Sequence, residues 1–291
     1  MMRESVDTAG AAGVLYLVST PIGNLEDMTL RALRVLKEVA LVAAEDTRHS
    51  RKLFSHYGIS TPLTSCHQHN EVGKGEQLLA ALREGRSVAL ISDAGTPGIA
   101  DPGYRLLCRC LEAGIEVVPI PGPSAVVTAL SVSGLPTERF AFEGFLPAKK
   151  QARLAQLATL QSESRTLVFY EAPHRLLATL KDLIAVCGTT RPAVVARELT
   201  KLHEEVFRGT LAGALDHFSS ARVRGEIVLL VGPALEVEEK PAETVKDALL
   251  RLHRETALPR RQLVKRVAKE LGLPGAEVYR ESLELPELGK D

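Results

Sequence analysis

A short unit recurs along the first 135 residues: an apolar run, a turn rich in small residues, and then apolar residues at helical spacing. The apolar runs are "VLYLVS", "VALVAA", "VALIS" and "VVPI". Continuous apolar strands that alternate with helices are typical of a mostly parallel sheet covered on both faces. The pattern therefore predicts an α/β domain over 14–136. The apolar stripe of its first helix is expected to contain Leu30, Leu33, Val35 and Leu36.

The pattern changes after "LPTERFAFEGFLPAKK", which we interpret as the passage to a second domain. Strands now follow one another more closely: "RTLVFYEA", "PAVVARELT", "HEEVFRGT" and "GEIVLLVGP". Close strands with fewer helices indicate a mixed α+β sheet over 137–233. We expect 1–13 to be a disordered tail and 234–241 a linker. Residues 242–291 form a small helical module, with two or three helical patterns broken at Pro259 and at Gly272/Pro274.

Three strands of the first domain end in loops of small and kinking residues. These loops are 19–24, 93–98 and 121–125. In a parallel sheet the carboxyl ends of the strands meet at one edge, where ligands bind. Glycine permits close approach of the backbone to a ligand, and proline stiffens the loop. The loops therefore predict one cleft built mainly from main-chain groups.

The segment "ISDAGTPGIADPGYR", residues 91–105, offers no cation before Arg105. The loops match neither the dinucleotide-binding nor the Walker pattern. Helix N-termini hold phosphates without lysine, so the missing cations only weaken a phosphate site. Asp93, with Asp101 nearby, favours a ligand that is neutral or positively charged, such as S-adenosylmethionine. The alternative left open is that Asp93 is a turn residue satisfied by its own loop.

Charge and cysteine usage narrow the classes of partner. Lys and Arg total 36, as do Asp and Glu, so no global field attracts nucleic acid or membrane. Seven basic residues and one acidic residue lie between Arg251 and Lys269, which indicates either an RNA contact or a solvated helical surface. The four cysteines form no CxxC and indicate reduced thiols in a cytoplasmic protein. The longest uncharged stretch, 117–137, contains four prolines, so no membrane span is expected.

Seven segments, in chain order, resemble the tetrapyrrole methylase superfamily. They most closely resemble its bacterial branch that methylates a cytidine 2′-hydroxyl of small-subunit ribosomal RNA. The resemblance covers about 15–232, and the basic helical tail is similar too. The segments are "LVSTPIGNLEDMTLRALRVLKEV", "AAEDTRHSRKL", "SDAGTPGIADPG", "PIPGPSA", "GLPTERFAFEGFLPAKK", "FYEAPHRL" and "ARELTKLHEE".

The resemblance implies a two-domain tetrapyrrole-methylase-like α/β fold, S-adenosylmethionine in the cleft between the domains, a homodimer, and methylation of a cytidine ribose in the decoding region. Gly98, Ile99 and the glycines of "HQHNEVGKGE" depart from the family pattern, which affects local contacts only. The cofactor residues that the resemblance implies in the first domain are Thr20, Pro21, Ile22, Gly23, Ser92, Asp93, Ala94, Gly95, Thr96, Ile99, Ser124 and Ala125. From the second domain, the residues that would close over the adenine are Phe169, Tyr170, Arg197, Glu198 and Leu199.

The polar loop "EDTRH" follows another strand of the same edge. Methyl transfer to a hydroxyl needs alignment of the reacting atoms and a base for the proton. We expect Glu45, Asp46 or His49 to take that proton and Arg48 to hold a phosphate. The alternative is that Asp46 caps the next helix and that Arg48 and Arg51 are solvated.

Other polar residues are candidates for RNA contact. His67 and His69 share a strand face, but without a third ligand nearby we expect no metal site. The candidates for the substrate RNA, together with Arg48, are Arg51, His67, Asn70, Arg175, Arg260, Arg261 and Lys265.

Two other functions remain open at this stage: a methylase acting on a tetrapyrrole carbon, and a nucleic-acid-binding module without activity. The basic tail separates the first of these from RNA methylation, because a small-molecule methylase has no evident use for it. Aromatic residues make up 4% of the chain and Trp is absent, so few bases can be stacked. Recognition by shape follows, and we expect the assembled small ribosomal subunit to be a better substrate than short RNA.

Overall fold

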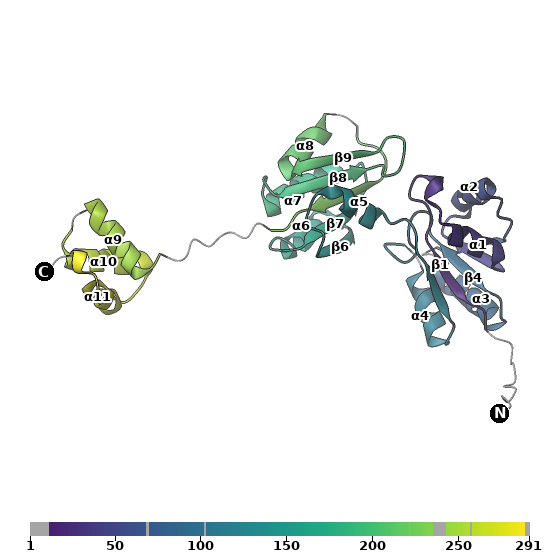
Figure 1. The fold of residues 1–291 in the computed structure, drawn as a ribbon, viewed down its shortest axis with the longest axis horizontal. Coiled ribbons are helices and arrows are strands. Elements are labelled where there is room, and N and C mark those ends of the chain that lie inside the picture. Colours follow the sequence, from purple (N-terminus) through teal and green to yellow (C-terminus); the bar gives the residue numbers. More distant parts are fainter. Residues whose placement is uncertain are drawn as a thin grey trace, which may run out of the picture. The chain divides into compact units, whose positions relative to one another are not determined.

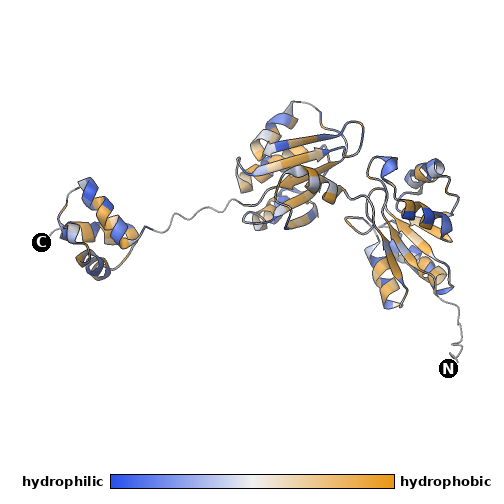
Figure 2. Ribbon diagram, in the orientation of Figure 1, coloured by the Kyte–Doolittle hydropathy of each residue, from blue (hydrophilic) through white to orange (hydrophobic). Residues whose placement is uncertain are grey.

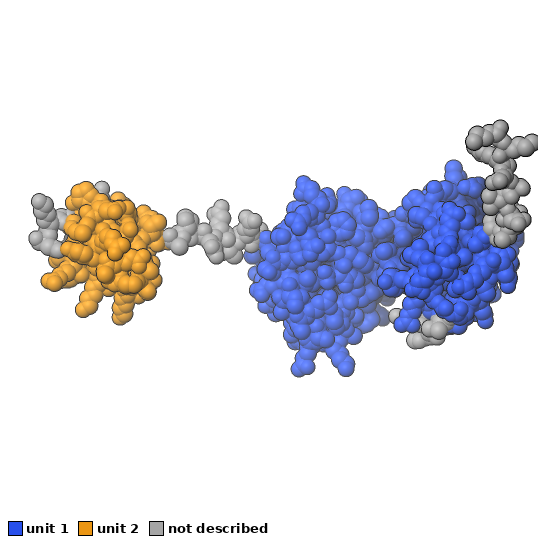
Figure 3. Space-filling view, turned by 90° about the horizontal axis from the view of Figure 1, so that it is seen from below, with its two compact units in different colours: residues 1–234 blue, residues 235–291 orange. Residues whose placement is uncertain are grey.

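A computed structural model describes residues 12–67, 70–101, 103–220, 222–234, 243–256 and 258–288. The chain forms two compact units, residues 1–234 and 235–291, which Figure 3 colours blue and orange. Most of the expected N-terminal tail and nearly all of the expected linker lie outside the described residues, as does His69.

The first sheet of the larger unit has five parallel strands in the order β3-β2-β4-β1-β5. Its strands are β1 (Leu15–Val18), β2 (Leu41–Ala44), β3 (Leu63–Ser65), β4 (Val88–Ile91) and β5 (Val117–Ile120). The short 3-10 helix η1 (Leu25–Asp27) follows β1. The other helices are α1 (Leu30–Glu38), α2 (Thr47–Tyr57), α3 (Glu71–Arg83) and α4 (Tyr104–Glu112). Apolar residues of α1 and α2 pack in one core cluster, and those of α3 and α4 in another, so helices cover both faces.

This confirms the parallel, doubly covered sheet that the apolar runs predict. All four residues of β4, the central strand, are buried, as a strand between two layers of helices requires. Figure 2 shows the apolar strands of this sheet between helices that carry polar residues. One detail differs: α1 buries Ala32, Val35 and Leu36, whereas Leu30, its first residue, is 86% exposed.

The second sheet has the order β6-β7-β10-β8-β9, and only the β6–β7 pair is parallel. This confirms the mixed sheet. Its strands are β6 (Phe140–Phe145), β7 (Thr166–Glu171), β8 (Pro192–Arg197), β9 (Glu205–Thr210) and β10 (Ile227–Val231). Its core cluster on one face takes residues from α6 (Lys150–Thr159), α7 (Leu176–Cys187) and α8 (Leu211–Ser219).

Two features of this half differ from the pattern-based expectation. The passage segment contains the edge strand β6, and α8 has no counterpart in the predicted elements. Helix α5 (Ala125–Ser133) packs its buried residues against the second sheet, although it directly follows the last strand of the first (Figure 1). The part of the chain that packs on the second sheet therefore begins before residue 137, with α5.

The smaller unit contains α9 (Val245–Thr256), α10 (Arg260–Leu271), α11 (Gly275–Leu283) and the short η2 (Pro286–Leu288). Its core includes Leu249, Leu263, Val267 and Val278. The breaks fall at Pro259 and at the Gly272 turn, where Gly272 has φ 65°. Within the part of the chain that the structure describes, no helix is long and apolar enough to cross a membrane, and no cluster of His, Cys, Asp and Glu could hold a metal ion.

Candidate functional site

The loops that follow β1, β4 and β5 are joined by hydrogen bonds at one edge of the first sheet. Thr20 and Gly95 exchange two main-chain hydrogen bonds, of 2.9 and 3.0 Å. The Thr20 hydroxyl donates to the carbonyl of Ser92 at 3.1 Å, and the Thr96 hydroxyl donates to the carbonyl of Pro123 at 3.4 Å. Gly95 has φ 80°, a conformation that favours glycine. The predicted main-chain cleft is thus present and pre-formed.

These loops form one wall of a cavity of about 410 Å³, which is within the range of small-molecule sites. The opposite wall comes from strand ends of the second sheet, which include Phe145, Tyr170 and Ala196. Much of the lining is apolar, and it includes Ile22, Ile99, Ala125, Leu199 and Val228. The cavity therefore offers an apolar surface for a flat ring and a polar edge made by the loops.

The charges in this cavity are all of one sign. Four acidic residues line it, Asp93, Asp101, Glu171 and Glu226, and its described lining contains no Lys, Arg or His. The carboxylate of Glu171 pairs with Arg175 and that of Glu226 with Lys201, each at 3.3 Å, so the acids of this lining without an ion-pair partner among the described residues are Asp93 and Asp101. Burial raises the pKa of Asp101 to about 6, against a hydrogen bond from Ser92 that lowers it, and the negative charge of Asp93 raises it further. A ligand with a positive charge would relieve this repulsion.

A second hollow of about 290 Å³ shares Ile22, Asp93, Ala94 and Glu226 with the first. Its lining also includes His49, one of the predicted proton acceptors, and the cations Lys52 and Lys201. The two hollows differ in charge, because only the smaller one has basic side chains in its lining.

Asp46 acts as a helix cap, so the structure supports the alternative reading of the "EDTRH" loop. Its carboxylate accepts a hydrogen bond from the Arg48 amide at 2.8 Å and pairs with the Arg48 guanidinium at 2.7 Å. These hydrogen bonds lower the pKa of Asp46 to about 2. A carboxylate so strongly held in its ionised form is a weak base, so this geometry favours the capping role of Asp46 over the predicted transfer of a proton.

Glu45 is in the opposite situation. Burial raises its pKa, and the charges of Asp101, Asp93 and Asp46 add to the effect in that order. The backbone of Asp46 donates to the Asp93 carboxylate at 2.9 Å, which ties this loop to the cavity wall. Glu45 itself is not among the lining residues of either hollow.

Most of the cofactor residues that the resemblance implies line one of the two hollows. Those in the lining of the larger cavity are Ile22, Asp93, Ala94, Gly95, Thr96, Ile99, Ser124, Ala125, Tyr170 and Leu199. Four more, Thr20, Pro21, Gly23 and Ser92, are in the lining of the smaller one.

Three of the implied cofactor residues lie elsewhere. Phe169 is fully buried in the second core, on the opposite face of β7 from Tyr170. Arg197 pairs with Glu205 at 2.7 Å. Glu198 accepts from Lys201 at 2.8 Å and from the amide of Glu226 at 3.0 Å. None of the three lines either hollow, and their side chains contact other parts of the protein; that they contact the cofactor stays a prediction of the resemblance.

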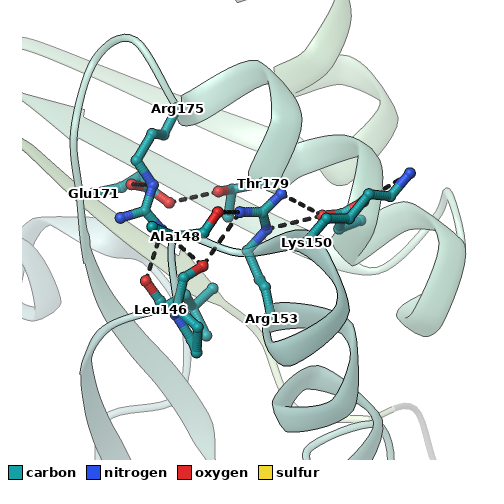
Figure 4. A network of polar contacts seen from close by, with 9 residues as sticks. Leu146, Ala148, Lys150, Arg153, Glu171, Arg175 and Thr179 are labelled. Carbon is teal, nitrogen blue, oxygen red and sulfur yellow. Dashed lines mark hydrogen bonds and ion pairs between the residues drawn. The ribbon is translucent and has the colours of Figure 1, made fainter.

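The predicted RNA contact Arg175 is also held inside the protein (Figure 4). Its guanidinium donates to the carbonyl of Leu146 at 2.6 Å and to that of Pro147 at 3.2 Å, and it lies 3.3 Å from the buried Glu171 carboxylate. The structure therefore favours a positioning role for Arg175 over contact with RNA.

His67 and Asn70, two further predicted RNA contacts, form hydrogen bonds within their own loop. The amide of His67 donates to Asn70 at 2.8 Å, and the Asn70 amide group donates to the carbonyl of Ser65 at 3.3 Å. Arg48 and Arg51 are exposed on α2, beside the predicted catalytic loop.

The basic residues of α10 fall into two groups. Arg260 donates to the carbonyl of Leu285 at 3.4 Å, so its side chain serves the fold of its own unit. The others are exposed and have no ion-pair partner among the described residues. They follow one another at helical spacing and form a stripe, hereafter the α10 basic stripe, made of Arg261, Lys265, Arg266 and Lys269.

Pattern reasoning missed two cavity residues that the structure makes prominent. Phe145 ends a strand within the segment that the sequence pattern indicates as the connection between the two domains, and Glu226 lies in a polar loop with no motif. The segment "FAFEGF" carried an alternating signal for a strand, which a more local reading would have found. Nothing in the residues around Glu226 marks it as part of a cavity.

Comparison with known proteins agrees with the geometry. The family model for tetrapyrrole (corrin/porphyrin) methylases matches residues 14–215. The ribosomal RNA small subunit methyltransferase I of Synechocystis sp. is 50% identical over 276 residues, which cover 94% of this chain and 98% of that protein. The protein of the same name from Escherichia coli O157:H7 is 47% identical over 287 residues, 97% of this chain and 99% of that protein.

Solved structures with this fold are more distant in sequence. The uroporphyrin-III-C-methyltransferase of Thermus thermophilus has a TM-score of 0.56 at 24% identity and covers 78% of this chain and 98% of its own. A diphthine synthase has a TM-score of 0.61 at 14% identity, with 76% and 90% covered. The chain thus belongs to the tetrapyrrole methylases and, within them, to the ribosomal RNA small subunit methyltransferase I family.

Proposed function

We propose that this chain transfers a methyl group from S-adenosylmethionine to the 2′-hydroxyl of a cytidine in the decoding region of small-subunit ribosomal RNA. The observation that carries the proposal is the acidic, cation-free cavity in a chain that shares about half of its residues, over nearly its whole length, with proteins named for methylation of this RNA. The charge of the cavity supports S-adenosylmethionine as the methyl donor, and the sequence similarity to these proteins supports ribosomal RNA as the acceptor.

The cavity residues fit S-adenosylmethionine. Asp93 and Asp101 offer negative charge to a ligand that carries a sulfonium and an ammonium. The apolar wall that includes Ile22, Tyr170 and Leu199 is suited to an adenine ring, and main-chain groups of the loops are available to its polar edges. The ligand supplies a methyl group on a positively charged sulfur. The protein then has to hold that methyl group in line with the attacking oxygen and to exclude water.

A ribose hydroxyl reacts faster when a nearby base takes its proton. Of the three candidates that the sequence suggested, Asp46 is unsuited, because its pKa is about 2. Glu45 retains the role in our proposal, since burial and neighbouring carboxylates raise its pKa and make it a better base. His49 is the second choice, because it lines the hollow next to the donor cavity.

We assign RNA binding to the α10 basic stripe and to Arg48 and Arg51 on α2. Exposed cations on a helix face attract the phosphate backbone and release counterions when it binds; of these residues Arg48 must share its charge with Asp46, to which it is paired. We retain the expectation that the assembled small subunit is the preferred substrate, since a folded particle presents phosphates in a fixed arrangement that several separate basic groups can match.

We also propose a homodimer in the cytoplasm. Leu30 and Leu202 are 86% and 93% exposed, and a partner surface would cover such side chains at a gain of free energy. Sedimentation of the full chain tests this point: a single species at the monomer mass over a wide range of concentration would contradict it.

The two alternative functions fit less well. A methylase of tetrapyrrole carbons has no evident use for the α10 basic stripe, and the solved methylases of that kind share the fold at 24% identity or less. A binding module that has lost its activity has no need of an acidic donor cavity, whose carboxylates are costly to bury together.

The test is methyl transfer to small ribosomal subunits prepared from cells that lack this modification. The full chain is incubated with S-adenosylmethionine labelled in its methyl group, and the labelled RNA is digested and mapped. We expect label on one cytidine ribose, with much less on a short oligonucleotide of the same sequence. Label on a base, equal labelling of both substrates, or no label on RNA would overturn the respective part of the proposal.

A further inference from the structure

An irregularity in the edge strand β6 places an aromatic side chain at the cavity. The β6–β7 pairing runs from Phe140 to Phe142, shifts by one residue, and resumes at Gly144. Gly144 has φ 64°, which a glycine adopts without strain. The extra residue reverses the alternation of side chains, so Phe145 lies on the same face of the sheet as Phe142.

Phe145 contacts Tyr170 at this face. In the strand register it lies beside Tyr170, and their ring centroids are 5.5 Å apart at an interplanar angle of 58°. Phe142 supports Tyr170 from the other direction, with ring centroids 4.9 Å apart. Both Phe145 and Tyr170 line the 410 Å³ cavity, but Phe145 is 56% exposed. A large part of its ring is therefore available to a ligand.

The chain that follows Phe145 is held in place by two arginines, the buried Arg153 and the half-buried Arg175 (Figure 4). Arg175 donates to the carbonyls of Leu146 and Pro147. Arg153 donates to the carbonyls of Pro147 and Ala148, at 3.3 and 3.2 Å, and forms a buried ion pair with Asp182 at 2.7 Å. The exposed ring thus stands on a rigid support, which lowers the entropy cost of stacking a ligand on it.

We propose that Phe145 is the stacking platform for the nucleobase of the nucleotide that receives the methyl group. This rests on the proposed function. Asp93 and Asp101 attract the positively charged donor to the loop wall of the cavity, which leaves the exposed Phe145 ring on the other wall to the RNA. Proteins that take a single nucleotide out of an RNA fold commonly stack its base on an aromatic ring.

The chain has no Trp, so Phe145→Trp installs a single fluorescent reporter at the rim. We expect its emission to be quenched by protein-free small-subunit ribosomal RNA in the presence of S-adenosylhomocysteine, and to change little with S-adenosylhomocysteine alone. Phe140→Trp is the matched control, because Phe140 lies on the same strand, is 42% exposed and does not line the cavity. Quenching by S-adenosylhomocysteine alone would overturn the proposal, since the adenine would then be the stacked ring. Equal quenching of both reporters by RNA would overturn it as well.

Kinetic variants give the second readout. Phe145→Ala and Phe145→Leu are expected to lower kcat/KM for small subunits by about fivefold to about 100-fold, the range for loss of one stacked base, with S-adenosylmethionine affinity unchanged. Phe145→Tyr keeps the ring and is expected to stay within about threefold of the wild type. A Phe145→Leu variant as active as the wild type would contradict a role in stacking.

The affinity for small subunits, measured with S-adenosylhomocysteine bound, separates the stacking role of Phe145 from the proposed methyl transfer. If the wild type transfers no methyl group but Phe145→Ala still weakens this binding, the proposed function fails and the stacking role toward RNA stands. If Phe145→Ala binds as the wild type does, the platform fails.

Discussion

The 410 Å³ cavity, hereafter the donor cavity because we propose that the methyl donor binds there, and the α10 basic stripe carry opposite charge within a chain whose formal net charge is zero. The described lining of the cavity contains no cation, and two of its acids, Asp93 and Asp101, have no ion-pair partner among the described residues. The stripe presents four cations without an ion-pair partner among the described residues. The cavity keeps its charges partly buried, where they interact strongly, whereas the stripe exposes its charges to solvent, where salt screens them.

This contrast teaches that the net charge of a chain says little about its ligands. A partly enclosed set of carboxylates selects a small ligand with a positive charge by short-range contacts. An exposed set of cations attracts a large polyanion over a distance set by the ionic strength. If the two regions bind these two ligands separately, substitutions in the cavity affect donor binding alone, and substitutions in the stripe affect RNA binding alone.

The largest effect is expected from Asp93→Asn. This substitution removes one negative charge from the cavity at nearly constant shape, and the new amide oxygen can still accept the hydrogen bond from Asp46. We expect affinity for S-adenosylmethionine to fall about 10- to 100-fold, as for loss of a hydrogen bond to a charged group. Calorimetry measures it. Unchanged affinity would remove Asp93 from the site.

The next effect concerns the α10 basic stripe. Replacing Arg261, Lys265, Arg266 and Lys269 by Gln is expected to lower affinity for small-subunit RNA about tenfold or more at 0.1 M salt and to reduce the slope of log K against log salt by about three. Binding of S-adenosylmethionine should not change.

The matched control in the same unit is Lys246→Gln. Lys246 is a cation that already pairs with Glu281 and Glu284, so its charge is less available to phosphates. A salt slope that responds to Lys246→Gln as much per charge as to the stripe would mean that the stripe has no special role.

A smaller effect is expected from pH. Because the pKa of Asp101 is raised to about 6, its carboxylate is mostly ionised at pH 7 and mostly protonated at pH 5. A cationic ligand binds the ionised form better, so affinity for S-adenosylmethionine should fall as the pH falls, by about five- to tenfold between pH 7 and pH 5. In Asp101→Asn this dependence should flatten, and a slope that persists there would assign the effect to another group.

The smallest effect is expected from Asp46→Asn. Asparagine caps helices about as well as aspartate, and the pKa of about 2 leaves Asp46 little capacity to take a proton. Methyl transfer should stay within about twofold of the wild type, with a small fall in thermal stability from the lost pairing with Arg48. A loss of activity as large as that of Asp93→Asn would restore Asp46 as a candidate base.

Much of the fold and of the donor cavity could be predicted from the sequence, because both depend on local patterns. Buried parallel strands read as continuous apolar runs, and their carboxyl ends meet at one edge whatever the order of the strands. The loops at Thr20, Gly95 and Ser124 could thus be placed together without a structure.

The rest depends on contacts between distant residues. Arg175 reads as an exposed cation in "EAPHRL", but its partner Leu146 lies 29 residues away in the sequence, directly after the neighbouring strand β6. The resemblance implies Arg197 and Glu198 as cofactor residues, and in the structure Arg197 pairs with Glu205 while Glu198 accepts a hydrogen bond from the amide of Glu226. No local sequence pattern predicts these hydrogen-bond and ion-pair partners. The position of Phe145 depends on a shift in strand register, which is a property of a strand pair and not of one segment.

The most direct test of the account compares S-adenosylmethionine with S-adenosylhomocysteine, which lacks the sulfonium charge, in calorimetric titrations of the wild type and of the Asp93→Asn, Asp101→Asn double variant. If the carboxylates bind the charged ligand through its charge, the double variant loses more affinity for S-adenosylmethionine than for S-adenosylhomocysteine, by about fivefold or more in the ratio of the two Kd values. If the ratio is the same in both proteins, the carboxylates of Asp93 and Asp101 do not favour the positively charged ligand, and their proposed role in binding S-adenosylmethionine is wrong.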